Sequence, residues 1–346
     1  MAPSIQNRFG LLQDLDSPNT EDSTSDGFTA FVVPKNRKKN RLQLAASAIT
    51  SGSSYDLEWK IDSCVTGVDV SQVQPQVVDQ FGVVEEMRTK KTHVVRGQKP
   101  LIPVLNYEKI RKVQEEKKMK MSIFEVLVAH VPSGNLAATY PKCEVFCKTG
   151  VLEGIGTRLY WQVELRMRAC CVDGAVFLEI DEGFVADYVK NHNSRFNLNL
   201  KTFKGKQFPK DITHDPKVTN GKFLEYRTVV TSTFPSFTVL STGEIDAADE
   251  NYELVEIKSR KEGLSPIFWR AQSCKLFLQM FFSGMKRCVQ GNSVDQKIVD
   301  IEELELEEIV LKGGAQEKEP WFKEDVLRFI DAFLIKVVEK RRESAA

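Results

Sequence analysis

GEIDAADENYELVEIKSRKEGLSPIFWR, residues 243–270, contains two strand-like runs in which charged and apolar side chains alternate. Side chains two residues apart in a strand point the same way. Glu244 and Asp246 are therefore predicted to share one face, and Glu256 and Lys258 are predicted to share another. Because only a short turn joins the two runs, we expect the strands to be neighbours. The three carboxylates and the ammonium group would then converge on one spot.

Three clustered carboxylates repel one another unless a cation lies among them. Mg²⁺ or Mn²⁺ suits such a site, since both are hard ions that bind a few carboxylates together with a substrate phosphate. Lys258 could orient or deprotonate an attacking water, or hold a phosphate oxygen. The spacing also fits a plain hairpin with a solvated charged face, and the pattern by itself leaves both interpretations open.

The chain around this stretch is predicted to alternate strands and helices. Strands are expected at 159–171 and 175–181, joined by a turn at Asp173-Gly174, and at 225–233, 237–246 and 252–258. A strand pair within 286–311 would include the acidic run 302–308 as a solvated strand face. Helices are expected at 107–130, within 185–220, at 266–284 with a stop at Gly284, and from Pro320 onward. This order predicts an α+β fold of mixed, largely antiparallel sheets flanked by helices, in one large domain.

Composition limits the domain plan and the function classes. Residues 1–55 are polar and lack apolar periodicity, so we expect a disordered tail followed by one domain over 56–346. Lysines and arginines number 48 and acids also number 48, so net charge does not favour bulk nucleic-acid binding. The basic cluster 34–41 fits a nuclear-import or nucleic-acid patch, and equally a solvated basic stretch.

The compartment can also be addressed from the sequence. No apolar run is long enough to span a membrane, and the first residues lack the pattern of a secretory signal. Seven cysteines without a repeated CxxC pair are typical of free thiols in a reducing compartment. We therefore expect a protein of the nucleus, the cytoplasm or both, which is neither secreted nor membrane-bound.

The sequence around Glu244, Asp246 and Glu256 resembles the DXO-type family of decapping and 5′-to-3′ exoribonuclease enzymes. These enzymes have a PD-(D/E)xK-like metal site and act on RNA 5′ ends. The matching elements are Glu244 with Asp246, Glu256 with Lys258, Ser265-Pro266 with Trp269-Arg270, and Gln279 followed by Gly284. The resemblance covers about residues 140–311 and is strongest over 243–284. It implies a PD-(D/E)xK-like core for the fold.

The resemblance also implies roles for individual residues. Asp246, Glu256 and the main-chain oxygen of Ile257 would hold a divalent ion, Mg²⁺ or Mn²⁺. Glu244 would reach the ion through water or hold the substrate. Lys258, with Gln279, would place the nucleophilic water and the scissile phosphate.

Two other places in the sequence match parts of these motifs. Gln272 matches the family's glutamine in its local tripeptide but lies too early relative to Gly284, so Gln279 is preferred. Glu179 and Asp181 repeat the Glu-x-Asp pattern without a nearby Glu-x-Lys, which favours a structural charge over a metal ligand.

The chain departs from the family at two places. Lys148 stands where the family has an RNA-contacting arginine, which keeps the charge and loses the two-pronged grip on phosphate. Residues 195–204, RFNLNLKTFK, contain no acid where the family has a further metal-binding glutamate. The leading hypothesis is a DXO-like hydrolase of RNA 5′ ends with a partly degenerate site. The alternatives are a weak or inactive RNA-binding regulatory member of the same fold, and an interaction protein that makes no RNA contact.

Overall fold

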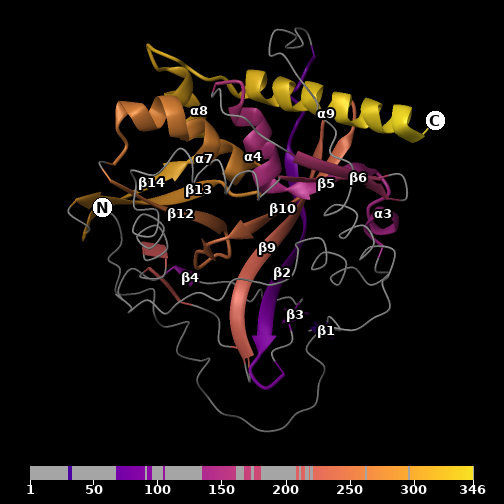
Figure 1. Ribbon diagram of the computed structural model, residues 1–346. Coiled ribbons are helices and arrows are strands. Elements are labelled where there is room, and N and C mark those ends of the chain that lie inside the picture. The colour runs from indigo at the N-terminus through magenta and orange to yellow at the C-terminus, as the bar shows by residue number, and fades with distance from the viewer. Residues whose placement is uncertain are drawn as a thin grey trace, which may run out of the picture.

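The structure, a computed structural model, describes residues 30–32, 68–89, 92–95, 104–105, 135–160, 167–172, 175–180, 208–209, 212–214, 218, 221–261, 263–294 and 297–345. Two β-sheets and a layer of helices make up this part of the chain (Figure 1). The helical layer lies along the top of the view in Figure 1, and the long strands β2 and β9 extend below it.

The larger sheet has eight strands in the order β1-β3-β2-β9-β10-β5-β7-β6. Their bounds are β1 Ala30–Val32, β2 Pro75–Glu86, β3 Thr92–Val95, β5 Cys143–Lys148, β6 Met167–Val172, β7 Ala175–Ile180, β9 Gly221–Thr233 and β10 Thr238–Ile245. Strands β10, β5 and β7 run parallel, whereas the other neighbours pair antiparallel.

The smaller sheet has six strands in the order β14-β13-β12-β11-β4-β8. Their bounds are β4 Val104–Leu105, β8 Thr213–His214, β11 Ala247–Ala248, β12 Leu254–Lys261, β13 Arg287–Val294 and β14 Lys297–Glu305. Strand β12 pairs parallel with β13 and antiparallel with β11. The chain passes from the larger sheet to the smaller one at Asp246, the single residue between β10 and β11.

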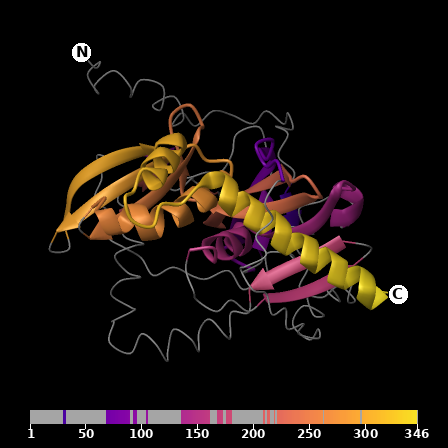
Figure 2. The same ribbon diagram turned by 90° about the horizontal axis from the view of Figure 1, so that it is seen from above.

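The helices are α3 Leu136–Thr139, α4 Thr149–Thr157, the π-helical turn η4 Phe268–Gln272, α7 Ser273–Phe281, α8 Leu306–Gly314 and α9 Lys323–Ala345. Helix α7 packs against α4 and α8, and α9 packs against α4. Figure 2 shows α9 running from the side of α8 toward the β6–β7 edge of the larger sheet. Among the described helices, none is long and apolar enough to cross a membrane.

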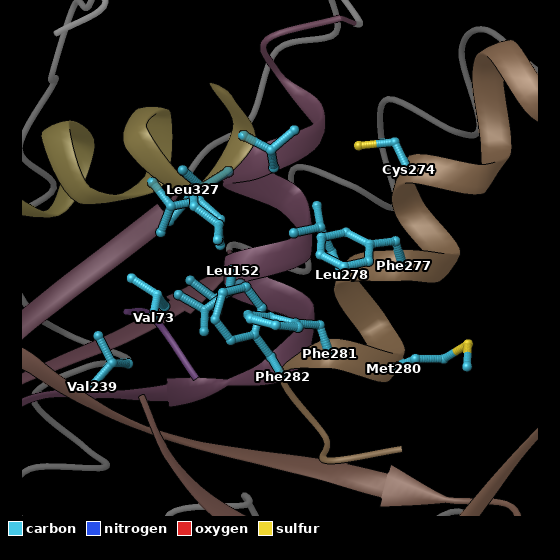
Figure 3. Packing of buried hydrophobic residues seen from close by; sticks show 14 of the residues in the cluster. Val73, Leu152, Val239, Cys274, Phe277, Leu278, Met280, Phe281, Phe282 and Leu327 are labelled. Carbon is cyan, nitrogen blue, oxygen red and sulfur yellow. The ribbon is translucent and has the colours of Figure 1, made fainter. Parts of the chain in front are cut away.

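The core lies where α4, α7 and α9 meet the larger sheet. Side chains from all of these elements converge there, and the aromatic residues of α7 point toward α4 (Figure 3). Phe277 and Leu278 are almost fully buried, as are Leu152 of α4 and Leu327 of α9. The apolar side chains of α7 and α9 are therefore core packing.

Two positions in and near this core require glycine, Gly243 and Gly284. A Cβ on Gly243 of β10 would lie 2.2 Å from Ser283 Oγ and 2.9 Å from Thr149 Oγ1, so any side chain there would force these neighbours to shift. Gly284 has φ +75°, a left-handed conformation that ends the helix at low cost. The predicted helix stop at this residue is confirmed.

The fold class is confirmed, because the sheets are mixed, largely antiparallel and flanked by helices. Two details differ from expectation. The acidic run 302–308 is strand only to Glu305 and then becomes α8, whose first turn carries Glu307 and Glu308, where acids favour a helix N-terminus. Leu159 and Tyr160, expected to begin a strand, form a turn after α4.

Several other expectations fall on the undescribed part of the chain. The predicted helix at 107–130, most of the segment 185–220 and the turn at 173–174 lie outside the described residues. Of the tail 1–55, the structure describes Ala30–Val32 alone, and these residues form β1 at the edge of the larger sheet.

Candidate active site

Asp246 lies at the junction of the two sheets. Its neighbour Ile245 is buried in the core and holds the end of β10 in place. The carboxylate of Asp246 accepts a hydrogen bond of 2.9 Å from the main-chain N–H of Ile257 on β12. This bond fixes the carboxylate beside the peptide that links Glu256 to Ile257.

Glu256 and Lys258 point to the same side of β12, as the strand period predicted. Lys258 Nζ forms an ion pair with Glu256 Oε1. The same oxygen accepts a 2.8 Å hydrogen bond from Nε2 of Gln279 on α7. The Glu256 side chain is 1% exposed whereas that of Lys258 is 32% exposed, so the ammonium group reaches solvent and the carboxylate does not.

The second oxygen of Glu256, Oε2, is buried and has no hydrogen-bond partner among the described residues. Burial, together with the nearby Asp246, raises the pKa of Glu256 to about 8 against the opposing effect of Lys258. Burial would lower the pKa of Lys258, but attraction to the carboxylates of Glu256 and Asp246 outweighs this and raises it. The single charge of Lys258 therefore does not offset burial and the negative charge of Asp246 at Glu256.

These residues fit a divalent metal ion. A buried carboxylate oxygen without a donor is costly unless a cation or donor meets it. Glu256 Oε2 and the carboxylate of Asp246 supply hard oxygen ligands of the kind that Mg²⁺ and Mn²⁺ prefer. Within the described ranges, no group of three or more His, Cys, Asp or Glu side chains is arranged to hold a metal. Asp246 and Glu256 thus form a two-carboxylate site.

The third predicted carboxylate is not part of this group. Glu244 lies in β10, opposite Arg227 of β9, and its side chain is exposed. The strands that carry Glu244 and Glu256 contact each other but do not pair, because β10 belongs to the larger sheet and the short strand β11 pairs with β12 instead. Glu244 thus lies in the last part of β10, whereas Asp246 lies at the junction between the two sheets.

Lys148 ends β5 and immediately precedes α4. Its register partner on β10 is Thr242, two residues before Glu244, so Lys148 and Glu244 lie on the same face of the larger sheet. Lys148 Nζ forms an ion pair of 3.4 Å with Glu179 Oε1 of β7. Glu179 thus has a structural partner, whereas Asp181 and the acid-free stretch 195–204 lie outside the described residues.

Arg260, two residues beyond Lys258 on the same face of β12, was not among the site residues predicted from the sequence. Its Nε donates a 3.1 Å hydrogen bond to Oε1 of the fully buried Gln290 on β13, and its Nη1 donates to Oε1 of Gln272. The guanidinium carbon lies 4.4 Å from the centroid of the Phe268 ring. The strand period could have indicated Arg260, because Glu256, Lys258 and Arg260 alternate with less polar residues and extend the polar face of the strand by one more position.

The chain matches a family model described as RAI1-like PD-(D/E)XK nuclease over residues 105–345. Among solved structures, Scheffersomyces stipitis Rai1 is 17% identical with a TM-score of 0.61, covering 82% of this chain and 84% of that one.

Two other solved structures show the same fold. Candida albicans Rai1 in complex with pU5-Mn²⁺ is 14% identical with a TM-score of 0.61, covering 82% of this chain and 85% of that one. K. lactis Dxo1 in complex with manganese is 9% identical with a TM-score of 0.54, covering 91% and 89%. A search of curated proteins finds no match.

Proposed function

Because the chain belongs to the RAI1-like PD-(D/E)XK nuclease family, we propose that it is a metal-dependent hydrolase of RNA 5′ ends. The reaction would be decapping, removal of 5′ pyrophosphate, or 5′-to-3′ exonuclease cleavage. The observation that carries the proposal is the buried Oε2 of Glu256, which lacks a donor among the described residues and lies beside Asp246. A buried carboxylate oxygen without a donor, beside a second acid, is unfavourable unless a cation binds there.

The divalent ion, when bound by Asp246, Glu256 and the main-chain oxygen of Ile257, would neutralise charge on the phosphate and lower the pKa of a bound water. The protein's own groups hold this arrangement in place. The Ile257 N–H fixes Asp246, and Gln279 together with Lys258 fixes Oε1 of Glu256. These contacts leave Oε2 of Glu256 as the oxygen available for the ion.

The solvent-facing part of the site would receive the RNA. The ammonium group of Lys258 is the partly exposed cation beside the acids, so it is placed to hold the scissile phosphate or the attacking water. Glu244 would act from the neighbouring sheet face, through water or on the substrate. Lys148 would contact the RNA on that same face, where Glu179 holds its side chain.

The solved relatives support the class of ion and of substrate. The Candida albicans protein was solved with pU5-Mn²⁺, the K. lactis protein with manganese, and the Scheffersomyces stipitis protein with (3′-NADP)⁺ and a calcium ion. A phosphorylated oligonucleotide and a divalent cation are what the two-carboxylate site and Lys258 would bind in this chain.

The second candidate function is RNA binding without turnover. It is favoured by the two-carboxylate site, since a two-metal arrangement needs more acidic ligands than the described residues supply. It is also favoured by Lys148, which replaces an arginine and is held in an ion pair.

One experiment separates the two functions. RNA with a 5′ triphosphate or an incomplete cap is incubated with the protein and Mn²⁺ or Mg²⁺, and the released products are resolved. A hydrolase releases product only with the ion, and Lys258→Ala abolishes release, whereas the control Lys261→Ala, on the exposed end of the same strand, preserves it. Salt-sensitive RNA binding without any product would identify the binding protein. Neither cleavage nor binding would refute both functions.

We also propose that the protein acts in the nucleus or the cytoplasm, in the quality control of messenger RNA 5′ ends. The supporting features are the proposed substrate and the basic cluster 34–41. Replacing the basic residues of that cluster with glutamine and imaging a fluorescent fusion tests the nuclear part, because a nuclear protein that depends on the cluster would shift to the cytoplasm. Unchanged nuclear signal would refute the role of the cluster in import.

A further inference from the structure

Arg260 extends the polar face of β12 beyond the two-carboxylate site. Strand residues rise about 3.3 Å each, so the Cα of Arg260 lies about 7 Å from that of Lys258 and about 13 Å from that of Glu256. Both distances run along the same side of the strand. Arg260 is therefore too far along the strand to serve the metal ion, but it lies next to the lysine that faces the substrate.

The guanidinium of Arg260 is held in one orientation by neutral groups. On the inner side Nε donates to Gln290, which is 0% exposed, and on the outer side Nη1 donates to Gln272, whose side chain is exposed. The ring of Phe268 covers the guanidinium at 4.4 Å from its centroid. These three contacts restrict where the remaining N–H groups of the guanidinium can point.

No carboxylate neutralises this cation within the part of the chain that the structure describes. Arg227, Arg287 and Arg328 each donate to a carboxylate, whereas the partners of Arg260 are two amide oxygens and a ring. A half-buried arginine without a carboxylate partner among the described residues is suited to an anion from outside the chain. Arginine binds phosphate well because its planar fork offers two parallel donors.

We propose that Arg260 binds a backbone phosphate of the RNA, adjacent to the phosphate held at Lys258 and the two-carboxylate site. This inference rests on the proposed function for its ligand, a single-stranded RNA 5′ end. Arg260 sets the path of the strand across the face of β12, with Gln272, Gln290 and Phe268 as positioning residues that hold its fork. The substrate would thus cover at least two phosphates along this strand.

The test measures binding of a 5′-monophosphorylated oligoribonucleotide in EDTA, where no cleavage occurs, as a function of salt. For a single strand each phosphate contact contributes about 0.7 to the slope of log affinity against log salt. Arg260→Gln should reduce the slope by about 0.7, so that its defect is large at low salt and disappears at high salt. The control Lys261→Gln removes the same charge from the neighbouring residue and should keep the slope.

A second pair of variants leaves Arg260 in place. Gln272→Glu puts a carboxylate against the guanidinium at an exposed position, so it should lower the slope as Arg260→Gln does, without depending on a buried change. Gln74→Glu adds the same charge at another exposed position and should have no such effect. This pair decides the question if Arg260→Gln does not fold.

The outcomes separate this inference from the proposed function. A Gln272→Glu protein with the wild-type slope would overturn the role of Arg260 while leaving RNA binding intact. A weaker affinity that is the same at every salt concentration would show that Arg260 only supports the fold. Wild-type protein without salt-sensitive binding would refute both the RNA ligand and the contact.

Discussion

Replacing the two acids of the site should remove divalent-ion binding. Asp246→Asn with Glu256→Gln keeps the shape of both side chains and removes the charge that attracts the cation. We expect the affinity for Mn²⁺ and Mg²⁺, measured by calorimetry, to fall by more than about 100-fold, since loss of outer-shell support alone costs 10–100-fold in metal sites.

The structure also predicts how metal binding by the wild-type protein depends on pH. The pKa of Glu256 is raised to about 8, so below this pH the carboxyl group carries a proton that the cation must displace. Affinity should therefore fall about fivefold between pH 8 and pH 7 and about tenfold between pH 7 and pH 6, or about 50-fold in all. Above pH 8 it should level off.

The single variants assign this dependence. Glu256→Gln should bind the ion weakly, with little change between pH 6 and pH 8. Asp246→Asn should also bind weakly but keep a pH dependence, shifted to lower pH because Asp246 no longer raises the pKa of Glu256. The control Asp300→Asn with Glu250→Gln removes two exposed acids and should match the wild type. Wild-type affinity in the Asp246→Asn, Glu256→Gln protein would refute the metal site, and an unaltered pH profile in Glu256→Gln would refute the assignment of the proton.

Three further predictions concern the fold. Gly243→Ala should destabilise the protein by about 1–3 kcal/mol in urea unfolding, because the new Cβ would meet Ser283 Oγ at 2.2 Å, and adding Ser283→Ala should recover part of the loss. Failure of the second change to help would place the clash elsewhere. Burial raises the pKa of Asp331, whose Oδ1 has no hydrogen-bond partner among the described residues. The stability of the wild-type protein should therefore fall as the pH rises from 3.8, the pKa of the unfolded chain, through the raised pKa of the folded protein. Asp331→Asn should remove that fall, and identical pH profiles of the two proteins would contradict this. Deleting residues 1–55 removes the three-residue edge strand β1 and an otherwise polar segment that buries little apolar surface, so the melting temperature should shift by less than about 4 °C. A larger drop would show that the domain begins earlier.

Local patterns in the sequence were enough for the features set by the period of a single element. Glu256 and Lys258 lie on one face of β12 because strand side chains alternate, and Lys258 Nζ indeed meets Glu256 Oε1. The helix within 266–284 ends before Gly284 because only glycine adopts its φ of +75° without strain. The fold class followed from the order of such elements, whose signals are each contained in about ten neighbouring residues.

The position of Asp246 was decided by tertiary structure. The sequence placed Glu244 and Asp246 in one strand, but the chain leaves the larger sheet at Asp246, and the side chain is then held by the N–H of Ile257. Which strand pairs with which depends on contacts between residues far apart in the chain, and no local period encodes them. That Asp246 lies at the junction between the two sheets while Glu244 lies in β10 could not be read for this reason.

The two candidate glutamines show the same division. Gln272 and Gln279 are seven residues apart, so the helix period puts both on one face and about 10 Å apart along the axis. Glu256 and Arg260 are about 13 Å apart along β12. The packing of α7 against this strand matches the two spacings, so that Gln279 donates to Glu256 while Gln272 accepts from Arg260. The sequence predicts that both amides lie on one helix face. Which of them contacts Glu256 of the two-carboxylate site depends on the direction in which the helix crosses the strand, and only the tertiary structure determines that direction.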